Sequence, residues 1–115
     1  MPITLYHNPR CSKSREALEL LRSRDVEPEI VEYLKTPPPA AELERILGLL
    51  EMDPRMLMRK KESEYGELAL DDESLSPHEL IQAMIAHPIL MERPIAVTVD
   101  RAALGRPPAN VLDVL

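Results

Sequence analysis

The sequence contains a single cysteine, Cys11, and this residue is the one best suited to chemistry. Arg10, Lys13 and Arg15 surround it, and no acidic residue occurs within residues 1–15. A free thiol has a pKa of about 8.5, and cationic surroundings or a helix N-terminus lower it to ~3.5–7.5. The alternative is a small buried apolar residue, the usual role of a lone cysteine. The cluster of cations favours a reactive thiolate.

The spacing around Cys11 limits which thiol chemistry is available. Ser14 stands where a Cys-x-x-Cys motif would have its second cysteine. With one cysteine the chain cannot form an internal disulfide, so an external thiol must resolve any adduct formed on Cys11. A phosphatase loop of the Cys-x5-Arg type is excluded, because Ala17 occupies the position that needs arginine.

Composition excludes several other classes of protein. The chain has 115 residues, of which 44% are hydrophobic and 30% charged, as expected for one globular domain over residues 1–115. The net charge of −6 and the lack of Trp and Phe argue against a nucleic-acid-binding surface. No apolar run approaches the ~20 residues of a membrane span, and the N-terminus does not resemble a signal peptide. We therefore expect a cytoplasmic protein.

The hydrophobic pattern predicts the elements that position Cys11. A helix that begins after Cys11, capped by Ser12 or Ser14, joins two strands, which are therefore expected to be parallel. A turn at Asp100-Arg101 predicts a hairpin between the last two strands. Strands are expected at 3–7, 29–34, 94–99 and 102–104, further helices at 40–51, 55–62, 77–87 and 107–115, and an exposed irregular segment at 62–73.

This order of elements matches an α/β, thioredoxin-like fold. The expected architecture is a four-stranded mixed sheet with a helical insertion between the second and third strands, at about residues 40–87.

Residues 7–15 read His-Asn-Pro-Arg-Cys-Ser-Lys-Ser-Arg. This segment resembles the His-Asn-Pro-x-Cys-x-x-Ser-Arg signature of the glutaredoxin-coupled arsenate reductase (ArsC) family. The length of the chain resembles the short, YfgD-like branch of that family. Further matches follow in register at 27–28, 33–34, 37–38, 57–60, 87–90, 93–95, 106–107 and 111–113.

The resemblance implies a role for each matching residue. Cys11 would attack arsenate and form a thioarsenate adduct, His7 would influence the acidity of the thiol, and Ser14 would assist the thiolate. Pro94 matches the cis-proline that faces the cysteine, with Asn8 and Arg15 as supporting residues. Three arginines would hold the oxyanion, namely Arg59, Arg93 and Arg106.

The resemblance also implies the reaction partners. Glutathione is the expected co-substrate, glutaredoxin would complete the reduction to arsenite, and no bound cofactor is expected. Arginine suits the substrate because arsenate is a tetrahedral anion, and a guanidinium stays cationic and offers a planar fork of donors. Arg93 and Arg106 each precede a proline, which favours an extended backbone at both positions.

Two alternatives to an arsenate reductase remain. The chain could be a monothiol oxidoreductase acting on glutathione mixed disulfides, or a non-catalytic interaction module with a redox-sensing Cys11. Of the three functions, only the reductase requires the three arginines. A metal site is not expected, since His78 and His87 have no nearby partners of ligand type.

Overall fold

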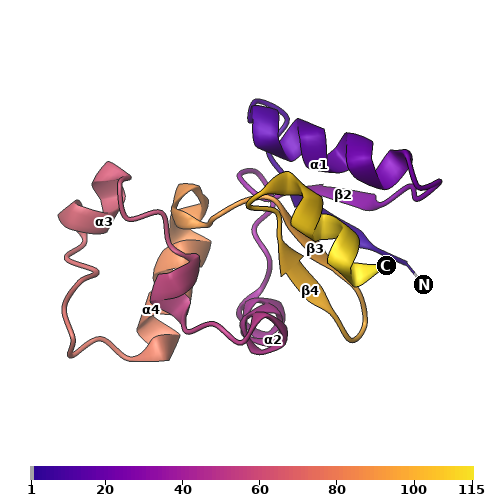
Figure 1. Cartoon of the computed structure of the whole chain (residues 1–115). Helices are drawn as coiled ribbons and strands as arrows, with labels where there is room; N and C mark the ends of the chain where they lie inside the picture. Colours follow the sequence, from indigo (N-terminus) through magenta and orange to yellow (C-terminus); the bar gives the residue numbers. More distant parts are fainter. Residues whose placement is uncertain (1) are drawn as a thin grey trace. The chain divides into compact units, whose positions relative to one another are not determined.

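The computed structural model describes residues 2–115, and its contacts divide the chain into two compact units. The first unit comprises Met1–Thr36 and Arg93–Leu115 and holds the sheet; the second comprises Pro37–Glu92 and is helical. The helical insertion expected at about 40–87 therefore lies within the second unit (Figure 1).

The sheet of the first unit contains four strands in the order β2-β1-β3-β4. Strand β1 pairs in parallel with β2 and antiparallel with β3, and β3 pairs antiparallel with β4. The predicted thioredoxin-like mixed sheet is thus confirmed, including the parallel first pair and the final hairpin. The bounds are Thr4–His7 for β1, Glu29–Glu32 for β2, Ile95–Val97 for β3 and Ala102–Leu104 for β4.

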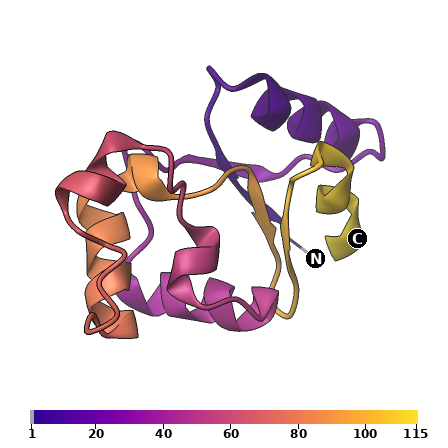
Figure 2. The ribbon, with the colours of Figure 1, turned by 60° about the vertical axis from the view of Figure 1, so that its left-hand side comes forward.

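One face of this sheet is covered by helix α1, Ser12–Arg22, and the 3-10 helix η3, Pro108–Val114. The two helices lie side by side in both ribbon views (Figure 2). Strand residues such as Leu5 point to this face and pack with Leu21 and Val111, all fully buried. This apolar layer fixes the start of α1 above the C-terminal end of β1, where Cys11 lies.

A close contact beside the start of β3 requires glycine at position 105. A Cβ atom there would lie 2.6 Å from Cγ of Pro94 and 3.0 Å from Cγ1 of Val111. The Gly105 N–H also donates to the Pro94 carbonyl, at 2.8 Å, so the backbone cannot withdraw without losing that bond. Pro94 follows a cis peptide bond from Arg93.

We expect Gly105→Ala to destabilise the protein by about 1–3 kcal/mol, because overpacking forces buried groups to shift. The measurement is the midpoint of urea unfolding. Gly48→Ala is the matched control: nothing lies within 4 Å of the Cβ it would add in the last turn of helix Ala40–Leu50. That variant should be more stable than the parent by up to about 1 kcal/mol. Equal effects of the two substitutions would contradict the packing described.

The second unit is built around helix α4, Pro77–Ala86, which contacts α2, η1 and η2. Ser76 caps α4 in a capping box with Glu79, as the Ser-Pro start of this helix predicts. The other elements are α2 at Ala40–Leu50, η1 at Pro54–Leu57, α3 at Ser63–Glu67 and η2 at Pro88–Leu90.

Two local predictions in the second unit were wrong. The helix expected at 55–62 is only the short 3-10 helix η1, because Met58 is extended and forms a β-bridge with Met91. This long-range pairing overrides the helical pattern of the local sequence. Within the expected irregular segment 62–73, residues 63–67 form α3. No residue of α3 is buried, so the sequence carried no apolar periodicity by which to recognise it.

Candidate active site

The loop between β1 and α1 is held in shape by Asn8. Its carbonyl accepts from the Cys11 N–H at 3.0 Å, and its side-chain Oδ1 accepts from the Arg10 N–H at 3.0 Å. Arg15 donates from Nη1 to the Pro9 carbonyl at 2.9 Å, which ties the loop to the first turn of α1. The predicted supporting residues Asn8 and Arg15 therefore both contact the loop that carries Cys11.

Cys11 is the N-cap residue of α1, so its thiol lies beside the unpaired N–H groups of the helix start. Its side chain is half-buried. Burial raises the pKa of the Cys11 thiol, but the backbone N–H groups of Ser14 and Lys13 and the Arg93 guanidinium outweigh burial and hold the pKa below its ordinary value. A thiolate at this position is stabilised mainly by hydrogen bonds and by Arg93.

The predicted helix cap was wrong. Neither Ser12 nor Ser14 is the N-cap residue of α1. Ser14 is fully buried, and its Oγ accepts from the Asn8 N–H at 3.1 Å and shares a hydrogen bond of 2.6 Å with Nδ1 of His7. The Ser14 hydroxyl therefore forms hydrogen bonds with β1 and the following loop, whereas the local sequence pattern predicts that it caps the helix.

His7 is buried at the end of β1, with 5% of its surface exposed. Desolvation lowers the pKa of its imidazole, against the opposing effect of Glu32. The neutral ring is therefore favoured near pH 7, and its bond to Ser14 joins β1 to the start of α1. His7 and Ser14 lie in one buried pair beneath the loop that carries Cys11.

We expect the alkylation rate of Cys11 by iodoacetamide to rise with pH around a midpoint clearly below ~8.5. A folded-state pKa below the unfolded value means that the thiolate forms at lower pH in the native protein. The same titration in denaturant is the control and should return the midpoint to ~8.5. Arg93→Gln should raise the native midpoint. A native midpoint at or above that of the denatured chain would contradict a stabilised thiolate.

Arg93 presents unused donors beside the thiol. Its guanidinium lowers the pKa of the Cys11 thiol, first of all through its positive charge. Its Nε and Nη1 atoms are buried and have no hydrogen-bond partner among the described residues. Buried donors are almost always paired, and an unpaired one costs about 1–3 kcal/mol, so this arrangement indicates a position for an acceptor that the chain itself does not supply.

The other two predicted arginines are placed differently. Arg106 is an exposed residue of the first unit and follows β4, before a cis peptide bond to Pro107. Arg59 belongs to the second unit, where its Nη1 pairs with Glu62 at 2.8 Å and its Nε lies 4.0 Å from Glu92. These glutamate partners of Arg59 were not predicted from the sequence, and an oxyanion bound by Arg59 would compete with them.

A cavity of about 350 Å³ adjoins the loop before Cys11. It is lined by His7, Asn8, Pro9 and Arg10 on one side and by Glu32, Leu34 and Lys35 on the other. Glu32, Leu34 and Lys35 were not predicted from the sequence to be part of a site. The predicted parallel pair of strands could have indicated this site, because parallel strands end at the same sheet edge and ligands of α/β sheets bind there.

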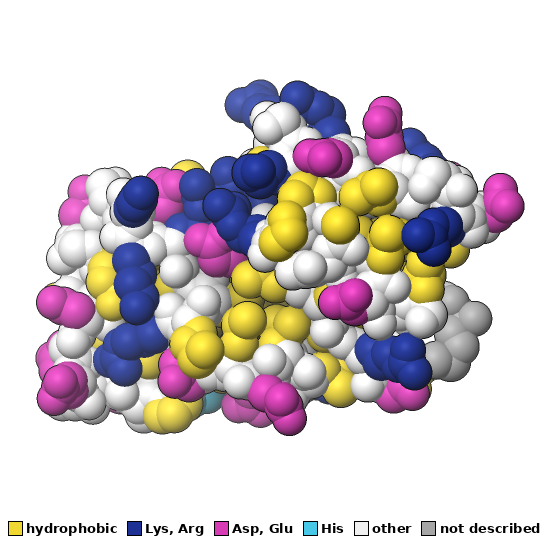
Figure 3. Space-filling model, in the orientation of Figure 1, with side chains coloured by type: hydrophobic (Ala, Val, Ile, Leu, Met, Phe, Trp, Pro, Cys, Tyr) yellow, Lys and Arg dark blue, Asp and Glu magenta, His cyan; other side chains and the backbone are white. Residues whose placement is uncertain are grey.

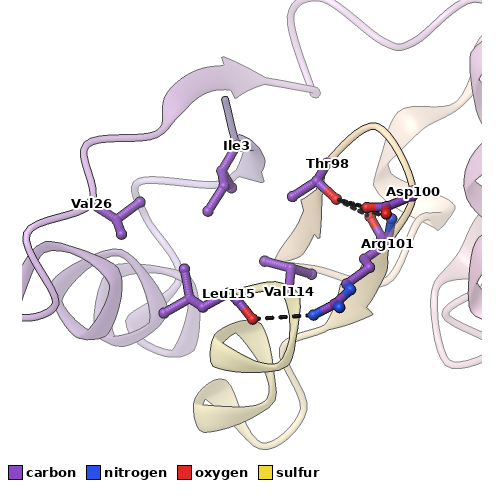
Figure 4. A pocket seen from close by; sticks show the side chains of 7 residues that line it. All are labelled: Ile3, Val26, Thr98, Asp100, Arg101, Val114 and Leu115. Atoms are coloured by element: carbon purple, nitrogen blue, oxygen red, sulfur yellow. Dashed lines mark hydrogen bonds between the residues drawn. The ribbon is translucent and has the colours of Figure 1, made fainter. Parts of the chain in front are cut away.

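A second cavity lies beyond the opposite end of β1 (Figure 4). It measures about 430 Å³, and Arg101 donates across it to the Leu115 carbonyl at 3.2 Å. Ile3, which precedes β1, lines this cavity, whereas Cys11 follows β1, so we place the thiol chemistry at the other end. The lining residues are Ile3, Val26, Thr98, Asp100, Arg101, Val114 and Leu115.

The fold and the site together define a class of protein. A four-stranded mixed sheet, a half-buried cysteine at the N-cap of the first helix, and a cis-proline before β3 are features of thioredoxin-like thiol proteins. Among residues 2–115, no cluster of His, Cys, Asp or Glu suited to a metal ion occurs, and no helix has the length and apolar character needed to cross a membrane.

Comparison with known proteins identifies the family. The chain belongs to the ArsC family, whose sequence profile matches residues 6–114. It is 55% identical over 114 residues to YfgD of Escherichia coli K12, covering 98% of this chain and 96% of that protein. It is 44% identical to an arsenate reductase of Rhizobium meliloti, covering 100% and 82% of the two chains. The solved structure of an arsenate reductase from Vibrio cholerae has a TM-score of 0.95 at 46% identity, covering 100% and 98%.

Proposed function

We propose that the chain reduces arsenate to arsenite with glutathione and glutaredoxin as the source of electrons. The observation that carries this proposal is the pair formed by Cys11 and Arg93. A stabilised thiolate lies beside the Arg93 guanidinium, whose Nε and Nη1 atoms are buried and have no hydrogen-bond partner among the described residues. An anionic nucleophile and an anion binder at the same point suit attack on an oxyanion. The relatives named arsenate reductase support the same substrate.

In the proposed reaction, the Cys11 sulfur forms a bond to arsenic and one arsenic–oxygen bond breaks, with that oxygen leaving as water after protonation. The Arg93 guanidinium holds the oxyanion and offsets the repulsion between thiolate and arsenate. Arg106, which belongs to the same unit as Arg93, is the second proposed member of the anion clamp. The resemblance assigns the same role to Arg59, which pairs with Glu62 in the second unit. Asn8 and Arg15 hold the loop in place, while His7 and Ser14 support the start of the helix.

The remaining steps need a second thiol because the chain has only one cysteine. A glutathione thiol attacks the adduct, and glutaredoxin completes the release of arsenite. Overall, one arsenate and two thiols give one arsenite, one disulfide and one water, so arsenic gains the two electrons that the thiols lose. No bound cofactor is required in this scheme.

An assay of arsenate-dependent NADPH oxidation with glutathione, glutaredoxin and glutathione reductase tests the proposal. We expect oxidation that saturates with arsenate and stops when glutathione is omitted. The same activity with and without arsenate would overturn the proposed substrate. Exchange with a glutathione mixed disulfide would then remain as the second candidate, which the stabilised thiolate of Cys11 also supports.

A further inference from the structure

We propose that glutathione docks in the cavity lined by residues 7–10 and by Glu32, Leu34 and Lys35, held through its two carboxylates and its ammonium group. This inference rests on the proposed function, because that function requires an external thiol. Every lining residue belongs to the first unit, which also holds Cys11.

The charges of the cavity complement those of glutathione. Arg10 and Lys35 supply two cations, and Glu32 supplies one carboxylate. Glutathione at neutral pH carries two carboxylates and one ammonium group, the opposite set. Lys and Arg side chains also gather over the start of α1, where the chain leaves this loop (Figure 3). The cavity is therefore expected to bind a thiol that carries two carboxylates more tightly than a neutral or cationic thiol.

The cationic groups of the cavity can bind a ligand with little loss of stabilising interactions within the protein. Lys35 pairs with Glu32 at 3.6 Å, and their side chains are 78% and 43% exposed. An exposed pair of this kind contributes little to stability, so both members can exchange partners. The Arg10 guanidinium forms no hydrogen bond or ion pair with any residue of the described chain, and Leu34 adds an exposed apolar surface for the peptide backbone.

The position of the cavity suits delivery of a thiol to Cys11. Arg10, which lines the cavity, immediately precedes Cys11 in the sequence. Consecutive Cα atoms are 3.8 Å apart, so this wall of the cavity contains the direct neighbour of the nucleophile. An extended tripeptide is about 10 Å long, with its thiol on the middle residue. Its ends can contact charged groups while its thiol remains free to turn toward the adduct on Cys11.

The binding test uses S-methylglutathione, which has the charges of glutathione but cannot react. Titration into nitrogen-15-labelled protein should shift the amide resonances of Asn8, Arg10, Leu34 and Lys35 in a saturable way. Arg10→Gln and Lys35→Gln should each raise the Kd about five-fold, the size of one exposed charge contact. Arg24→Gln is the matched control, since Arg24 is an exposed arginine outside the cavity lining, and it should leave the Kd unchanged.

Truncated ligands extend the same test. S-methylcysteinylglycine lacks the γ-glutamyl carboxylate, and the C-terminal amide of S-methylglutathione lacks the glycine carboxylate, so each should lose sensitivity to one of the two cation substitutions. Absence of saturable shifts at residues 7–10 and 32–35, or an equal Kd in parent and variants, would overturn the docking site. This result can be separated from failure of the proposed function. Loss of arsenate reduction with intact binding refutes the reductase, whereas arsenate reduction without binding at this cavity refutes the docking site.

Discussion

Replacing Cys11 with serine is expected to reduce both arsenate reduction and glutathione mixed-disulfide exchange to background. A serine hydroxyl at this N-cap is not ionised at neutral pH and cannot form the sulfur–arsenic bond. The fold should survive, because Cys11 is half-buried and serine is itself a favourable N-cap residue. The measurements are the two activities and the midpoint of urea unfolding. Ser12→Ala is the matched control, since this exposed neighbour has no part in the proposed chemistry.

Residual arsenate turnover in Cys11→Ser would contradict the proposed nucleophile. Loss of activity together with a large fall in the unfolding midpoint would mean that the substitution acted through the fold. Cys11→Ala then supplies the second measurement, because alanine removes the nucleophile without adding a new polar group.

Replacing Arg93 with lysine is expected to lower arsenate turnover by roughly ten- to a hundred-fold. Lysine keeps the charge but loses the planar fork whose Nε and Nη1 atoms are buried without partners. One charge-assisted hydrogen bond contributes about 1.5–3 kcal/mol, and each 1.36 kcal/mol corresponds to a factor of ten in rate. Exchange with a glutathione mixed disulfide should fall much less, because that substrate carries no tetrahedral oxyanion. The measurement is the ratio of the two activities.

Arg24→Lys is the control for the arginine substitution, since Arg24 is exposed and follows the end of α1. Its two activities should match those of the parent. Equal losses of both activities in Arg93→Lys would show that Arg93 acts through the acidity of Cys11 and not on the oxyanion. No loss in either would remove Arg93 from the site. The iodoacetamide titration of the same variant separates these outcomes, because it reads the thiol pKa without arsenate.

The sequence by itself predicted the elements that carry strong local signals. The switch from the strand at residues 4–7 to the helix at 12–22 follows from a change in hydrophobic period after Asn8-Pro9. A helix between two strands predicts a parallel pair, and the β1 and β2 register confirms it. Ser76-Pro77 predicted the start of α4 correctly. In each case the deciding interactions are local or follow from chain connectivity.

The sequence also placed the nucleophile, but assigned part of its environment to the wrong groups. The helix N-terminus and the neighbouring cations Arg10, Lys13 and Arg15 were both expected to lower the pKa of Cys11. The backbone N–H groups of the helix start do lower it, but the cation that contributes is Arg93, and Arg15 instead holds the Pro9 carbonyl. Arg93 lies far along the chain and reaches Cys11 only through the pairing of β1 with β3. Charge counted along a sequence cannot include such a partner.

Only the tertiary structure decided the remaining features of the site. The burial of Ser14 against His7 removed it from capping, and the Met58–Met91 bridge ended the helix expected at 55–62. The cavity beside Arg10 requires Glu32 and Lys35, which adjoin that loop because two parallel strands end together. The physical reason is the same throughout: these interactions join groups distant in sequence, and local periodicity and propensity depend only on residues a few positions apart.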